Sequence, residues 1–210
     1  MENHEDYKIF LEVSVTDPKY TKSVKVAGKV PFTNIDTYYL IDEATKRFGF
    51  YGKGFGLKDI SYEYMDIADT KVAIIHATFF FPDGSFPITS SDKFVYKTKA
   101  GYDMIDTDIF KKLETNTLAK ALSKIGFGAD VYRGKFEDYN YVDEAANTHA
   151  LCSHEQQQKL RKGLGYYQVE VGKINTHFSI ATLADLLAKD YNEAEALVVS
   201  LSTRKKEEVK

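Results

Sequence analysis

Residues 71–91, KVAIIHATFFFPDGSFPITSS, decide the fold. Residues 71–81 are almost all β-branched, aromatic or alanine, which predicts a long strand with both faces covered. Residues 82–85, PDGS, favour a turn, because proline fixes one φ and glycine readily adopts a positive φ. Residues 86–91 then return as the partner strand, so the segment predicts a β-hairpin.

A further strand precedes this hairpin. Ile60, Tyr62 and Tyr64 alternate with polar residues, which is typical of a half-buried strand. Residues 55–91 therefore predict an antiparallel meander of about three strands. Residues 92–107 lack this alternation, and we expect them to form a locally basic loop.

Two amphipathic helices flank the meander. The first is expected to begin at Asn34 or Asp36 and to end at Gly49, with an apolar face of Tyr38, Ile41, Ala44 and Phe48. The second occupies residues 108–126, with an apolar stripe of Phe110, Leu113, Thr117, Leu118, Ala121, Leu122 and Ile125. The fold class is α+β: an antiparallel meander of about three to four strands covered by a long amphipathic helix, with extra C-terminal helices.

The pattern predicts three segments along the chain: an N-terminal basic arm or oligomerisation segment (1–34), a core (35–144) and a C-terminal helical extension (145–210). Within the extension, residues 154–162 and 179–202 predict helices, and residues 166–174 predict a strand.

Composition excludes several classes of protein. The chain has 210 residues, of which 43% are apolar, so a core can form and global disorder is excluded. No apolar run approaches the roughly 20 residues that span a bilayer, and the acidic start lacks a secretory signal. Cys152 is the single cysteine, which excludes an internal disulfide and favours a reducing, cytoplasmic setting.

Motifs for catalysis are weak. The chain has no phosphate-binding loop, and the glycines of residues 49–56 follow a helix, which is the wrong order for a dinucleotide site. His149, Cys152 and His154 lack a fourth metal ligand, and His76 is expected to be a core histidine. Acidic clusters at Asp66, Asp69, Asp103, Asp106 and Asp108 leave a metal-dependent nuclease open as an alternative, although such residues also cap helices. We therefore expect no enzyme activity, no cofactor and no metal.

The order of four motifs resembles a known family. They are residues 16–22 (TDPKYTK), 48–56 (FGFYGKGFG), 115–131 (TNTLAKALSKIGFGADV) and 136–141 (FEDYNY). Together they resemble the phage single-strand annealing proteins of the Sak and Erf group, and through them the annealing domain of eukaryotic Rad-fifty-two. The resemblance covers residues 16–142.

The resemblance implies a protein that binds single-stranded DNA and anneals complementary strands in bacteriophage homologous recombination and DNA repair. It implies the Rad-fifty-two-like annealing fold, a homo-oligomeric ring with DNA in a peripheral groove, no need for ATP, and a location in the cytoplasm of a bacterial host cell. Candidate partners are single-stranded DNA, a second copy of the chain, a single-strand binding protein and a phage exonuclease. Lys120 matches a basic position of the family helix, Ala119 departs from it, and Lys124 lies one place late.

The candidate phosphate contacts are Lys53, Lys93, Lys97, Lys99, Lys112, Lys120, Lys124, Arg133 and Lys135. Tyr51, Phe55 and Tyr96 are candidates for stacking on bases, although core packing is an equally good reading of these aromatics. Residues 93–135 carry a net charge of +4 and residues 136–210 carry −3, as an asymmetric binding surface requires. A protein-interaction module on the same fold, acting in phage–host defence, remains the main alternative.

Overall fold

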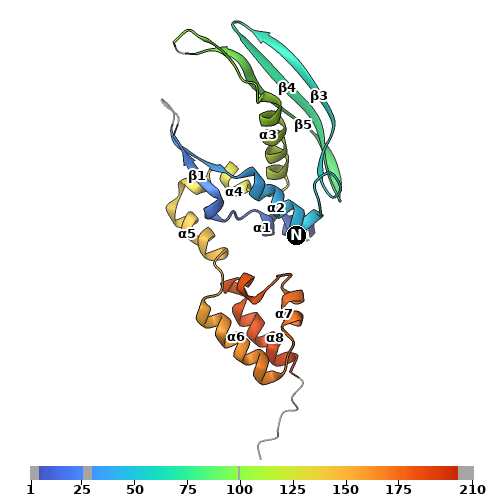
Figure 1. The fold of residues 1–210 in the computed structure, drawn as a ribbon, viewed down its shortest axis with the longest axis vertical. Coiled ribbons are helices and arrows are strands. Elements are labelled where there is room, and N and C mark those ends of the chain that lie inside the picture. Colours follow the sequence, from blue (N-terminus) through green and yellow to red (C-terminus); the bar gives the residue numbers. More distant parts are fainter. Residues whose placement is uncertain (1–4, 26–29, 99, 203–210) are drawn as a thin grey trace, which may run out of the picture. The chain divides into compact units, whose positions relative to one another are not determined.

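The computed structural model describes residues 5–25, 30–98 and 100–202, and it divides the chain into two compact units (Figure 1). The first unit is Met1–Asp138 and the second is Tyr139–Lys210. The first unit is α+β and contains a curled antiparallel sheet of four strands. The sequence placed the end of the core at residue 144, which lies inside helix α5 (Tyr139–Thr148) of the second unit.

The predicted meander is confirmed. The strands pair in the order β3 (Gly56–Ile67), β4 (Thr70–Phe81), β5 (Gly84–Lys97) and β6 (Asp103–Ile105). The expectation of a loop over residues 92–107 is wrong, because Val95 to Lys97 pair with β6. A bulge interrupts the alternation of apolar and polar residues in β5. Lys71 pairs with Val95 and Val72 pairs with Lys93, so β5 carries an extra residue at this point.

Helix α3 (Ile109–Lys124) lies on the concave side of the curled sheet (Figure 1). Alternate residues of β4 are buried on this side, and Ala73 and Ile75 pack with Ile109 and Leu113 of the helix. The other side of β4 is only partly buried, so the expectation that both faces are covered is wrong. His76 is exposed there rather than in the core.

His76 takes part in a polar cross-strand row on that open side. Its ring nitrogens lie 3.2 Å from the Glu63 carboxylate and 3.3 Å from the Thr89 hydroxyl, on the two neighbouring strands. Thr89 pairs directly with His76, and Glu63 lies two residues along β3 from Ser61, the direct partner of His76 on that strand. Direct partners and residues two places along a strand point to the same side of a sheet, which explains the row. The sequence did not predict that His76 is exposed, because its neighbours along β4 are apolar.

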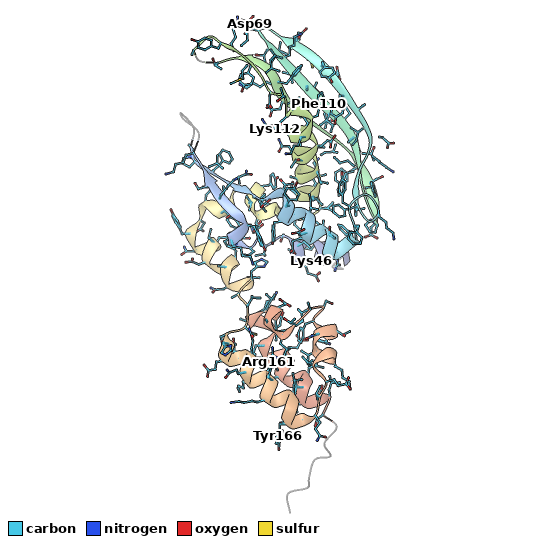
Figure 2. All side chains as sticks on the ribbon, in the orientation of Figure 1. Lys46, Asp69, Phe110, Lys112, Arg161 and Tyr166 are labelled. Atoms are coloured by element: carbon cyan, nitrogen blue, oxygen red, sulfur yellow. The ribbon has the colours of Figure 1, made fainter. Side chains whose placement is uncertain are left out.

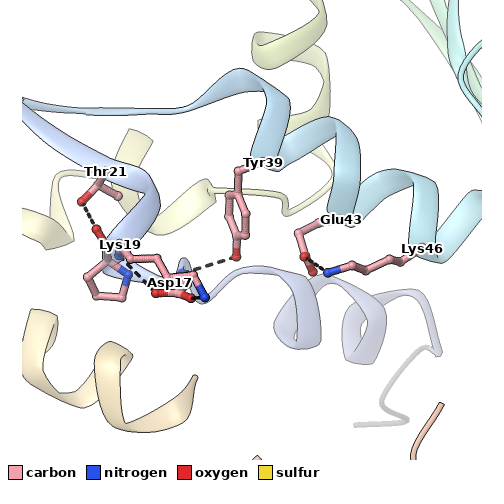
Figure 3. A network of polar contacts seen from close by, with 7 residues as sticks. Asp17, Lys19, Thr21, Tyr39, Glu43 and Lys46 are labelled. Atoms are coloured by element: carbon pink, nitrogen blue, oxygen red, sulfur yellow. Dashed lines mark hydrogen bonds and ion pairs between the residues drawn. The ribbon is translucent and has the colours of Figure 1, made fainter. Parts of the chain in front are cut away.

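Helix α2 (Thr37–Phe48) begins and ends where the sequence predicts. The Asp36 carboxylate accepts the Tyr38 N–H at 2.9 Å, and Gly49 ends the helix with a φ of 88°. The expected apolar face is wrong at Tyr38, which is 73% exposed, whereas Tyr39 is buried. Tyr39 is held inward because its ring stacks on Tyr20 at 4.3 Å and its hydroxyl accepts the Asp17 N–H at 3.3 Å (Figure 3).

The N-terminal segment forms helix α1 (Glu5–Val13), a short helix η1 (Pro18–Tyr20) and a hairpin of β1 (Thr21–Val24) and β2 (Phe32–Ile35). Lys19 is paired with Asp17 at 2.7 Å. The Thr21 hydroxyl donates to the Pro18 carbonyl at 2.8 Å, and Lys46 pairs with Glu43 (Figure 3). Lys29, a basic residue of the predicted N-terminal arm, lies outside the described residues.

Asp130 joins two of the motifs that carry the family resemblance. It lies in helix α4 (Ala129–Tyr132), which precedes the short helix η2 (Lys135–Glu137). Its buried carboxylate accepts the Thr16 N–H at 2.8 Å and the Thr16 hydroxyl at 2.5 Å. Gly128, which has a φ of +66°, packs closely against β2 and α2, because a Cβ there would lie 2.9 Å from terminal side-chain carbons of both Ile35 and Leu40.

The second unit is helical. It contains α5, α6 (His154–Tyr167), α7 (Val171–His177), η3 (Leu183–Asp185), η4 (Ala188–Asp190) and α8 (Tyr191–Ser200). It has a core of its own, in which Leu164, Ile174 and Val198 are buried. The predicted strand over residues 166–174 is wrong, because Gln168 ends α6 in a left-handed conformation, with a φ of 55°, and α7 follows at once.

Candidate nucleic-acid interface

Two lysines of α3 lie beside the outer edge of β5. The Lys120 amine donates to the Thr89 carbonyl at 2.9 Å, and the Lys124 amine lies 5.9 Å from the centre of the Phe86 ring. Both lysines are exposed, and residues four apart share one face of a helix. The helix and the strand therefore place two positive charges and an aromatic face side by side.

The geometry of β5 explains why this edge is available. Within the described residues, β5 pairs with β6 only from Val95 to Lys97, which leaves residues 84–92 paired on one side alone. The Thr89 carbonyl points to the unpaired side, since it accepts from Lys120. Pro87, two residues earlier, faces the same way, and proline is tolerated there because it has no N–H to leave unpaired.

Strand β3 forms the opposite edge of the sheet. It pairs only with β4 among the described residues, and several of its apolar side chains are exposed: Ile60, Tyr64, Met65 and Ile67. A long apolar edge strand readily pairs with a strand of another chain. The sheet thus offers two unlike edges.

Three of the predicted phosphate contacts already have partners within the first unit. Lys112 pairs with Asp106 at 2.5 Å, and Lys97 pairs with Asp69 at 3.5 Å; Lys112 and Asp69 are labelled in Figure 2. The Lys93 amine lies 4.3 Å from the centre of the Tyr96 ring, which is half-buried. The ion pair with Lys112 lowers the pKa of Asp106, and the same contact raises the pKa of Lys112.

The remaining predicted basic residues are spread over the first unit. Lys53 is exposed in the turn between α2 and β3. Arg133 lies over the Phe10 ring at 5.0 Å, and Lys135 is exposed in η2. Lys99 lies outside the described residues. Lys120 and Lys124 thus contact the same strand, β5, whereas Arg133 contacts α1.

The predicted stacking residues differ in exposure. Phe55 is fully buried and packs against Phe48 and Tyr51, so the prediction that it stacks on bases is wrong. Its side chain points into the core, which is the alternative that the sequence left open for these aromatics. Tyr51 is 49% exposed and remains available. Phe50, which the sequence did not single out, is 77% exposed.

A second aromatic group lies at the N-terminal half of α3. Tyr62 and Tyr64 of β3 meet Phe110 edge to face, with ring centres 5.0 and 6.4 Å away, and Phe110 is labelled in Figure 2. The Tyr62 hydroxyl donates to the Glu114 carboxylate at 2.7 Å. Burial and this hydrogen bond raise the pKa of Tyr62 to about 12. The sequence placed Phe110 on the buried stripe, but 42% of it is exposed.

The acidic clusters are engaged with lysines. Asp66 pairs with Lys71 at 3.2 Å, and Asp69 and Asp106 have the lysine partners given above. Over residues 5–25, 30–98 and 100–202, no group of three histidine, cysteine or acidic side chains is placed to hold a metal ion. Across the same residues, no helix is long and apolar enough to cross a membrane.

The second unit contains an open hollow of about 490 Å³. Its rim is polar, with Arg161 (labelled in Figure 2), Gln168 and Glu170, and its apolar walls include Leu164, Val169 and Leu183. None of the sequence-predicted contact residues lines it.

The chain matches no protein-family model and no curated protein.

Proposed function

We propose that this chain binds single-stranded DNA and promotes the annealing of complementary strands in phage recombination, without ATP. The observation that carries the proposal is the pair of exposed amines, Lys120 and Lys124, beside the unpaired edge of β5. Amines that neutralise phosphates release counterions and reduce the repulsion between two strands. Annealing breaks no covalent bond, so this chemistry suffices.

The order of elements supports the same proposal. A helix, a glycine-rich aromatic turn, a meander and a long helix over it are what the resemblance to the Rad-fifty-two-like annealing fold implies. Two lysines of the helix, Lys120 and Lys124, lie in the motif that the resemblance assigns to DNA contact. Ala119 is buried, so the departure from the family pattern removes a charge from a position that points inward here.

The test of the function is an annealing assay with two complementary labelled oligonucleotides, at about 50 and 200 mM salt. Lys120→Ala/Lys124→Ala is expected to slow annealing. It should also reduce the slope of log affinity against log salt by about 1.4, because each phosphate contact on a single strand adds about 0.7. Gel mobility of the labelled strands measures the rate, and fluorescence anisotropy measures the affinity.

Lys162→Ala/Lys173→Ala is the matched control, since it removes two exposed lysines from the second unit. It should leave both the rate and the slope unchanged. Wild-type annealing no faster than buffer alone would contradict the proposal and favour the protein-interaction module.

We also propose that copies of the chain assemble edge to edge into a ring through β3. Met65→Lys/Ile67→Lys introduces charges on exposed apolar positions of this edge, and lysine on an edge strand opposes pairing. Light scattering should show a loss of the assembled species at micromolar concentration. Val199→Lys, at an exposed apolar position of α8, should leave the mass unchanged. A wild-type chain that stays monomeric with and without oligonucleotide would refute the ring.

A further inference from the structure

The turn between α2 and β3 has a fixed backbone. We call residues 49–55 the aromatic turn. The N–H groups of Lys53 and Gly54 both donate to the Phe50 carbonyl, at 3.0 and 2.8 Å, and the Gly52 N–H donates to the Phe55 carbonyl at 2.6 Å. These hydrogen bonds therefore fix the backbone from which the side chains of the aromatic turn project.

Glycine is required for this conformation. A Cβ at Gly54 would lie 1.8 Å from the Phe48 carbonyl oxygen. A residue with a side chain therefore cannot occupy this position unless the backbone moves. Gly49 and Gly52 have φ values of +88° and +81°, where side chains are strained, yet each faces open space.

The aromatic turn presents two rings to solvent. Phe50 is 77% exposed and Tyr51 is 49% exposed, and the Tyr51 ring rests edge-on against buried Phe55 at 5.7 Å. Scattered exposed aromatics are ordinary, but these two are neighbours in the sequence on one hydrogen-bonded turn, and we call them the platform.

The turn and its flanks carry basic residues. Residues 47–58 contain Arg47, Lys53 and Lys58 and no acidic residue, although Arg47 pairs with Glu12 at 3.7 Å. Lys53, inside the turn, is exposed. An unpaired nucleobase with its phosphate offers both things that such a surface binds, a flat π face and a negative charge.

We propose that the aromatic turn is a base-stacking subsite for single-stranded nucleic acid, in which Phe50 and Tyr51 stack on unpaired bases and Lys53 binds the adjoining phosphate. The proposal rests on the proposed function and adds to it a contact with the bases themselves, in which Phe50 takes part. Stacking tolerates any sequence, because every base has a π face. A strand held in this way keeps the hydrogen-bonding edges of its bases available for a complementary strand.

The chain has no tryptophan, so Phe50→Trp introduces a single indole reporter. Its fluorescence is expected to be quenched by oligo(dT) and to be unchanged by an abasic oligonucleotide of the same length, which keeps the phosphates but lacks the bases. Tyr38→Trp is the control, because Tyr38 is a comparably exposed aromatic on α2 of the same unit. Its indole should not respond to either oligonucleotide.

Phe50→Ala should weaken binding of oligo(dT) at least about fivefold and leave binding of the abasic oligonucleotide unchanged. Equal quenching of Phe50→Trp by both oligonucleotides, or no quenching while the wild type binds oligo(dT), would overturn the subsite and leave the proposed function standing. A change of oligomeric mass in Phe50→Ala, with no change in affinity per protomer, would instead make Phe50 a contact between copies and overturn the subsite. A wild-type chain that binds neither oligonucleotide would refute the proposed function, and the subsite with it.

Discussion

Gly54→Ala is expected to lower the free energy of unfolding of the first unit by at least about 3 kcal/mol, which is in the range of severe backbone strain. The added methyl would lie 1.8 Å from the Phe48 carbonyl oxygen, and neither atom belongs to a flexible side chain. The turn must open, and Phe55, which is fully buried, would be displaced with it. Hydrogen exchange of the β4 amides in the full chain measures the effect in the unit concerned.

Gly84→Ala is the matched control, at the first residue of β5. A Cβ there would lie 3.5 Å from the nearest atom, an ordinary contact with the Phe81 ring. The change should cost less than about 1 kcal/mol. If Gly54→Ala were as mild as Gly84→Ala, the tight turn described above would be wrong.

Asp130→Ala is expected to destabilise the first unit by about 3 kcal/mol or more, because it breaks a buried hydrogen-bond network. The Thr16 N–H and hydroxyl would lose their acceptor, and Thr16 is itself buried. The Val131 N–H, which donates to the same carboxylate at 2.8 Å, would lose one as well. Hydrogen exchange of the β1 and β2 amides, which follow Thr16 closely in the chain, reports the loss.

Two variants make this measurement specific. Thr16→Val removes the hydroxyl and keeps the shape of the side chain, so it should cost less than Asp130→Ala. Asp66→Ala removes a carboxylate whose side chain is 74% exposed and paired with Lys71, and an exposed pair contributes about 1 kcal/mol or less. Equal effects of Asp66→Ala and Asp130→Ala would show that Asp130 does not hold the N-terminal segment.

The fold was predictable where one local signal dominates. Residues 71–91 predicted the hairpin of β4 and β5, and Asp36 and Gly49 bounded α2 correctly. The predictions failed where a distant contact decides the outcome. Tyr39 is buried rather than Tyr38 because Tyr20 and Asp17 contact it, and neither contact leaves a trace in the periodicity of α2.

The candidate interface was less predictable than the fold. The sequence assigned Lys120 and Lys124 to one face of a helix, but it gave no information that Thr89 and Phe86 lie beside them. It also treated Lys112 and Lys97 as available, because the sequence does not show that Asp106 and Asp69 pair with them. Phe50 was overlooked since glycine-flanked aromatics can be buried, as Phe55 is, or exposed, as Phe50 is.

The hydrogen bond from Lys120 to Thr89 bears on the phosphate contact that we propose for this lysine. A lysine side chain on a bare surface loses its rotational freedom when it binds a ligand, and that loss of entropy opposes binding. The hydrogen bond to the Thr89 carbonyl already restricts the rotation of the Lys120 side chain, and its ammonium group has further N–H donors. If Lys120 binds phosphate as proposed, each phosphate would therefore meet a charge whose orientation was settled during folding rather than at the moment of contact.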